Sequence, residues 1–224
     1  MPRWAEMMKA DSISADAAGN ALDRNALVAR GQRLEYFTLA WNGFEAAVAL
    51  ASGLLAGSMA LVGFGLDSVI ETASAGTLLW RFRADADAAR RERAERTAHR
   101  LVGVCFLLLA AYVAVESLRA LWMKAVPERS LPGILIAAAA VIVMPLLARA
   151  KLRVARQLSS RALHADSRQA DFCMYLSAIL LAGLLLHALL GWWWADPVAA
   201  LVMLPIIARE GVLGLRGETC DDCA

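Results

Sequence analysis

The chain has 224 residues, of which 59% are hydrophobic and 20% charged, with a formal net charge of +2. The charged residues gather in a few segments between long apolar stretches, which is typical of an integral membrane protein. Basic residues placed this way indicate membrane topology and contact with anionic lipid, so we exclude nucleic-acid binding. The first 24 residues contain no apolar core, and we therefore expect no cleaved signal peptide.

Six segments are predicted to span a membrane, because each approaches the roughly 20 predominantly apolar residues that a spanning helix needs. They are residues 36–56, 60–80, 101–123, 131–149, 170–190 and 195–210. Asp196 and Pro197 favour the start of the last helix, since the first can cap it and the second needs no N–H partner. The predicted fold class is an all-α integral membrane protein with a six-helix bundle.

The distribution of Lys and Arg predicts that both termini face the cytoplasm. In that orientation 20 of the 23 basic residues lie on the cytoplasmic side. Only Arg119, Lys124 and Arg129 lie in the outside turns or at the end of the third span. We expect an inner or plasma membrane location. The predicted organisation is a cytoplasmic segment over 1–34, a transmembrane domain over 35–210 and a cytoplasmic tail over 211–224. The basic linkers between the second and third spans and before the fifth are interpreted as solvated or interfacial helix.

The first two predicted spans carry acidic residues where apolar ones are expected. Asp67 and Glu71 are spaced i, i+4, which places both carboxylates on one helix face. Since a charge at bilayer depth costs about 2.5–3.5 kcal/mol on insertion scales, this pair indicates a cation site. Asn42 and Glu45 in the first span either line a cation path or form hydrogen bonds within the bundle.

The fifth span begins with a second polar pair at the same spacing, Gln169 and Cys173. A thiolate binds borderline and soft metals, so a carboxylate pair facing Gln169 and Cys173 suits a divalent transition metal. Alternatively, Cys173 is a small apolar packing residue. Asp166 and Asp171 are candidates for the entrance of the cation path, or are only charges at the cytoplasmic interface.

The tail contains Cys220 and Cys223 in a CxxC pattern with two acids between them. This pattern is half of a zinc or copper(I) site, and we interpret it as a candidate for metal capture. Two alternatives stay open, an idle thiol pair and a redox pair.

The run AGSMALVGFGLDSVIE resembles the second transmembrane helix of the cation diffusion facilitators. The run ALHADSRQADFCMYLSAILLAGLLLHALLGWWWADPVAALVM is similar to their fifth and sixth helices, and the resemblance covers about residues 30–210. It implies a six-helix antiporter, usually a homodimer, that exports a divalent cation in exchange for protons. It also implies that the family's cytoplasmic C-terminal domain is missing after Arg209.

The resemblance also assigns the site residues. Asp67 falls on the first Asp of the family's Asp-x3-Asp, and Glu71 on the second with one extra methylene. The fifth-helix pattern His-x3-Asp places Gln169 on the His and Cys173 on the Asp. A register that uses Asp171 instead breaks this spacing.

The sequence therefore predicts a divalent-metal exporter, with zinc as the first choice of substrate, proton antiport as the mechanism and no prosthetic group. The bilayer, the metal ion, protons and a second copy of the chain are its expected partners. A non-transporting metal sensor or accessory subunit is the first alternative, and a scaffold whose acids pair internally is the second. We expect no enzymatic activity, because we find neither a nucleophile–base set nor a phosphate-binding glycine loop.

Overall fold

The computed structural model describes the backbone of residues 3–83, 88–158 and 161–216, and the side chains of 25–73, 75–76, 100–158, 163, 167 and 169–216. In these ranges the chain forms six helices and no strand. They are α1 (Arg3–Ala56), α2 (Met59–Arg83), α3 (Ala88–Met123), α4 (Leu131–Leu158), α5 (Arg161–Leu190) and α6 (Ala195–Arg216). The predicted all-helical class is confirmed. The basic linkers are largely helical, since α3 already begins at Ala88 and α4 continues to Leu158.

Five of the helices contain, among their described residues, a segment long and apolar enough to cross a membrane. These segments are Asn25–Ala56, Arg100–Met123, Leu131–Leu158, Gln169–Leu190 and Ala195–Arg216. Over its described residues α2 does not meet this measure, but it packs against α1, α3, α5 and α6. From Met59 to Glu71 its side chains are buried or half-buried except Val69. Because neighbouring helices surround it, α2 can carry acids without exposing them to lipid.

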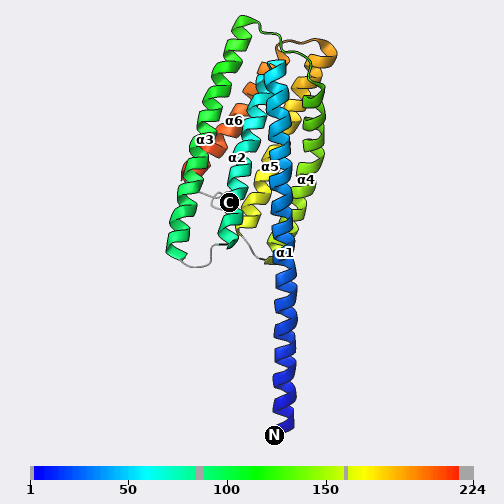
Figure 1. The fold of residues 1–224 in the computed structure, drawn as a ribbon, viewed down its shortest axis with the longest axis vertical. Helices are drawn as coiled ribbons and strands as arrows, with labels where there is room; N and C mark the ends of the chain where they lie inside the picture. Colours follow the sequence, from blue (N-terminus) through cyan, green and yellow to red (C-terminus); the bar gives the residue numbers. More distant parts are fainter. Residues whose placement is uncertain (1–2, 84–87, 159–160, 217–224) are drawn as a thin grey trace.

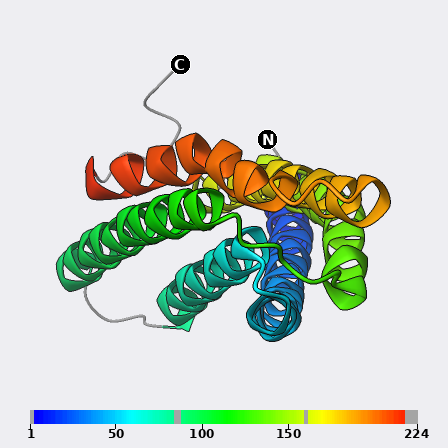
Figure 2. The same cartoon turned by 90° about the horizontal axis from the view of Figure 1, so that it is seen from above.

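The helices run up and down in turn, and the N-terminal part of α1 extends beyond the bundle (Figure 1). The most extensive helix pairs are α4 with α5, α3 with α6, and α1 with α2, and α1 also packs on α4. Figure 2 shows α3 and α6 side by side along one flank of the bundle. The core between the helices includes Leu61 and Phe64 of α2, Met144 of α4, Leu180 of α5 and Met203 of α6.

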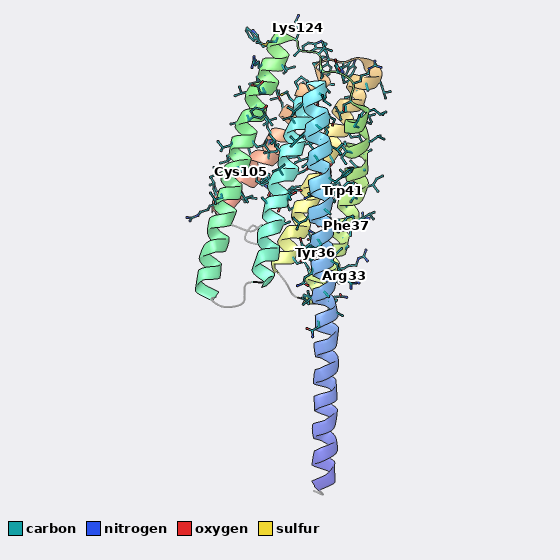
Figure 3. All side chains as sticks on the ribbon, in the orientation of Figure 1. Arg33, Tyr36, Phe37, Trp41, Cys105 and Lys124 are labelled. Atoms are coloured by element: carbon teal, nitrogen blue, oxygen red, sulfur yellow. The ribbon has the colours of Figure 1, made fainter. Side chains whose placement is uncertain are left out.

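The outer surface of the bundle is apolar between two polar ends. Tyr36 and Phe37 are about half exposed on α1, and Arg33 lies one turn away, near one end (Figure 3). Lys124 lies at the opposite end, after α3 (Figure 3). Aromatic and basic side chains favour the two membrane interfaces, so these residues mark the depth of the bundle in a bilayer.

The start of α2 is fastened to the start of α6. Gly57 adopts a left-handed conformation with φ of 67°, which lets the chain reverse between α1 and α2 in two residues. The Ser58 hydroxyl accepts the N–H of Leu61 and donates to Asp196, while the other Asp196 carboxylate oxygen accepts the N–H of Met59 at 2.9 Å. The sixth helix thus begins where predicted, but the described side-chain hydrogen bonds of Asp196 cap α2 and not its own helix.

Small residues let α3 and α6 approach closely. A Cβ atom on Gly103 would lie 2.6 Å from the Leu215 backbone nitrogen and 2.8 Å from the Gly211 carbonyl oxygen. Backbone atoms cannot swing away as a flexible side chain can, so only glycine fits this crossing.

We predict that Gly103→Ala destabilises the protein, because the added methyl group forces α3 and α6 apart. The expected loss is about 1–3 kcal/mol, or about 2–4 °C in Tm for each kcal/mol. Thermal unfolding in detergent measures it. Gly43→Ala is the matched control, because nothing lies within 4 Å of a Cβ at Gly43. That variant should be neutral or slightly stabilising, and equal losses in both would contradict the packing explanation.

Candidate metal centre

A stripe of polar side chains runs along the inward face of α1. Glu35, Thr38, Asn42 and Glu45 recur at spacings of three and four residues, and all four are buried. Thr38 bonds back to its own helix at the carbonyl of Leu34. The other three reach side chains of α2, α4 or α5.

Asp67 and Glu71 lie on the same face of α2 and point into the bundle, at 3% and 7% exposure. The Asn42 amide donates to Glu71 Oε2 at 3.0 Å. Among the described residues, Asp67 Oδ2 is buried without a hydrogen-bond partner. A buried carboxylate oxygen normally has a donor or a cation beside it, so this atom is available as a ligand.

Cys173 of α5 completes a compact group with the two acids. One ligand atom each from Asp67, Glu71 and Cys173 lies within 4.8 Å of the others, and all three side chains are buried. Ligands of a tetrahedral zinc ion, about 2.0–2.3 Å from the metal, lie about 3.3–3.8 Å from each other. Small side-chain rotations would therefore bring these three atoms to metal-binding distance.

Glu45 lies against this group. Its Oε1 accepts the Ser68 hydroxyl at 2.7 Å and lies 3.9 Å from Cys173 Sγ, while its Oε2 accepts the Trp41 indole N–H at 2.7 Å. From the sequence, Glu45 was expected either to line the cation path or to form hydrogen bonds within the bundle. Trp41 and Glu45 share the i, i+4 spacing, a signal that could have shown that this carboxylate is held in place.

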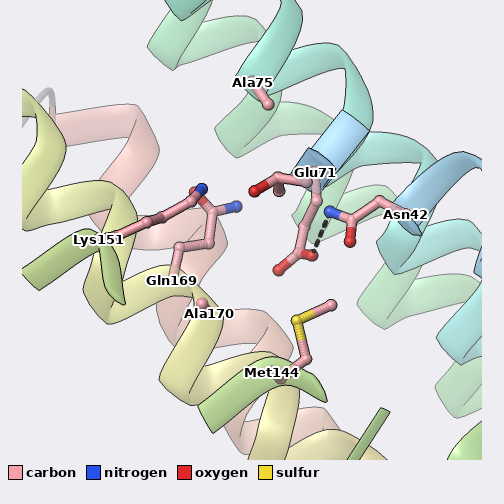
Figure 4. A pocket seen from close by; sticks show the side chains of 8 residues that line it. Asn42, Glu71, Ala75, Met144, Lys151, Gln169 and Ala170 are labelled. Carbon is pink, nitrogen blue, oxygen red and sulfur yellow. Dashed lines mark hydrogen bonds between the residues drawn. The ribbon is translucent and has the colours of Figure 1, made fainter. Parts of the chain in front are cut away.

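Gln169 lies in a small cavity beside Glu71. The cavity measures about 10 Å³, room for about one water molecule. Figure 4 shows Lys151 and Gln169 reaching into it from one side, and Glu71 and Asn42 from the other. Its lining consists of Thr38, Asn42, Glu71, Ala75, Met144, Lys151, Gln169 and Ala170. Gln169 is thus near Glu71, as its register predicts.

The structure describes the burial of some of the remaining predicted residues. Asp171 is exposed while Cys173 is fully buried, so the register that uses Cys173 is the one that faces the bundle interior. The side chains of Asp166, Cys220 and Cys223 lie outside the described residues, and their predicted roles stay predictions.

Sequence reasoning missed Lys151. It lies in a basic stretch interpreted as a solvated or interfacial face, yet its side chain is 1% exposed and its ammonium contacts Glu35 Oε2 at 3.2 Å. Helix α4 continues past the predicted end of the span at residue 149 and carries Lys151 into the interior. Its position three residues before the buried Val154, at helical spacing, was the available signal.

Two comparisons identify what the chain is similar to. Residues 36–216 match the family described as "Cation efflux transmembrane domain". A relative named Transmembrane protein 163, from Xenopus laevis, is 29% identical over 150 residues. That alignment covers 65% of this chain and 52% of the relative, so the chain spans about half the length of that relative.

We predict that two substitutions at the centre change the stability of the metal-free protein in opposite directions. Asp67→Asn should raise Tm by about 2–4 °C, the scale of about 1 kcal/mol, because it removes a buried carboxylate and its like-charge repulsion with the neighbouring acids Glu45 and Glu71. Asn42→Leu should cost about 1–3 kcal/mol, because it removes a donor to a buried carboxylate.

Thermal unfolding in chelator at mildly alkaline pH measures both. Glu116→Gln serves as control, since Glu116 lies in a surface ion pair, 3.7 Å from Arg119, and its loss should cost less than about 1 kcal/mol. If Asp67→Asn lowers stability, the carboxylates are not repelling each other.

Proposed function

Because the chain belongs to the cation efflux family, we propose that it transports a divalent transition-metal cation, with zinc as the first choice. The observation that carries the proposal is the close grouping of Asp67, Glu71 and Cys173 inside the membrane bundle. Carboxylates and a thiol are ligand types that zinc accepts, and because these three lie on two different helices, movement of the helices relative to each other can release the ion.

The ligand set supports zinc over harder ions. Carboxylates alone suit magnesium, calcium or manganese, whereas one thiolate shifts the preference towards zinc, with iron(II), cobalt, nickel and cadmium also compatible. We propose Gln169 as the fourth ligand, as the family register implies, through its amide oxygen. The position of Glu45 at 3.9 Å from Cys173 Sγ supports a second role for that carboxylate, receiving the ion as it passes.

We propose that the ion enters from the cytoplasmic side and leaves in exchange for protons. Carboxylates and a thiol must lose their protons before they bind a metal, so the metal and protons compete for the same atoms. Protonation of Glu71 and Cys173 on the far side would release the ion and couple export to the proton gradient. The proposed assembly is a homodimer in the plasma membrane with both termini cytoplasmic, and the tail pair Cys220 and Cys223 captures metal at the entrance.

We predict that a pH gradient drives zinc uptake into proteoliposomes containing the protein, and that Asp67→Asn lowers the rate by at least about tenfold. A zinc-sensitive dye inside the vesicles measures the flux, and a pH-sensitive dye measures the accompanying proton movement. Glu116→Gln is the control and should transport at the wild-type rate, because Glu116 lies in a surface ion pair with Arg119 and is not part of the ligand group. Zinc binding without flux for zinc, iron or manganese would instead support a metal sensor or accessory subunit.

We further predict that Cys173→Ser weakens zinc binding by at least about tenfold and leaves manganese binding nearly unchanged, because serine offers a harder oxygen. Competition titrations on the purified protein in nanodiscs compare the two metals. Cys105→Ser, at an exposed position on α3, is the matched control. If the affinities for zinc and manganese fall equally, Cys173 is a packing residue and does not coordinate the ion.

A further inference from the structure

An ion pair lies inside the bundle, next to the metal centre. The Lys151 ammonium of α4 contacts the Glu35 carboxylate of α1 at 3.2 Å, and the two side chains are 1% and 0% exposed. Both residues belong to helices long and apolar enough to span the membrane. Charges buried away from water are costly even when paired, so the pair calls for a functional explanation.

Lys151 lies near Glu71 of the centre as well as Glu35. It lines the same cavity as Glu71, Asn42 and Gln169 (Figure 4). Since the cavity holds about one water molecule, a metal ion bound at Glu71 would be close to the ammonium with little water between them. A lysine ammonium is a compact charge on a flexible four-carbon stem, so it can shift between two neighbouring carboxylates.

We propose that Lys151 is a built-in cation that competes with the transported metal for Glu71 and thereby sets the affinity of the centre. This inference rests on the proposed function. The ammonium contacts Glu35 in the structure, and a turn towards Glu71 across the shared cavity would offset the charge that the metal needs. When the metal binds, the ammonium returns to Glu35, which holds it away from the ion. Glu35 is thus a positioning residue, and the distance between Lys151 and the ion determines how readily the metal leaves.

The test compares two variants that shift zinc affinity in opposite directions. Glu35→Gln removes the carboxylate that the ammonium contacts, so the ammonium turns towards Glu71 and zinc should bind about tenfold more weakly. The double variant Glu35→Gln/Lys151→Met removes the competing cation together with the carboxylate that it contacts, so zinc should bind at least about tenfold more tightly than to wild type. Calorimetric titration with zinc in nanodiscs measures both affinities, and thermal unfolding confirms that each variant is folded.

Two controls separate charge from packing. Arg153→Met removes an exposed basic residue two positions along α4 and should leave affinity unchanged. Lys151→Arg retains the charge and should stay near the wild-type affinity. If the double variant binds zinc no more tightly than wild type, or if Glu35→Gln and the double variant shift in the same direction, the proposal is overturned and the pair serves structure alone.

The outcome also distinguishes this inference from the proposed function. If wild type binds no zinc, both fail together. If wild type binds zinc and Asp67→Asn abolishes binding, while the two pair variants leave affinity unchanged, only the role of Lys151 fails.

Discussion

Buried carboxylates inside an apolar bundle are the constraint to which the rest of the structure responds. Glu35, Glu45, Asp67 and Glu71 lie on the facing sides of α1 and α2, where water cannot solvate them. Three of them have hydrogen-bond donors within the protein that make burial tolerable. Lys151 bonds Glu35, Asn42 bonds Glu71, and Trp41 and Ser68 bond Glu45. Asp67 differs, because no side chain among the described residues bonds it and its Oδ2 is buried without a hydrogen-bond partner.

That difference connects stability to function. A fully paired set of acids would make a stable scaffold and a poor ligand set, since a metal would have to displace every donor first. An incompletely paired oxygen beside a second carboxylate and a thiol costs folding free energy, and a cation can recover that cost. The proposed transport of a cation fits this balance, because a transporter needs a site that binds its ion and then releases it.

The sequence predicted those parts of the centre that stand out against an apolar background. Asp67 and Glu71 interrupt a run of small and apolar residues, and the i, i+4 register then pairs Gln169 with Cys173 and not with Asp171. The six helices were predictable from the same contrast between apolar and charged segments. Lys151 was not predictable in this way, because it is one basic residue among several. The partner of Asp196 was equally hidden, since its hydrogen bonds cross 137 and 138 positions of sequence and depend on how α6 meets α2.

The hydrogen bonds between Asp196 and the start of α2 affect how α2 can move. If α2 tilts as a rigid body about its hydrogen-bonded start, each residue moves in proportion to its distance from Ser58. With a rise of 1.5 Å per residue, Asp67 lies about 14 Å and Glu71 about 20 Å from that point. The same tilt therefore moves Glu71 about 1.4 times as far as Asp67. Rocking of α2 would therefore carry Glu71 further from α5 than Asp67.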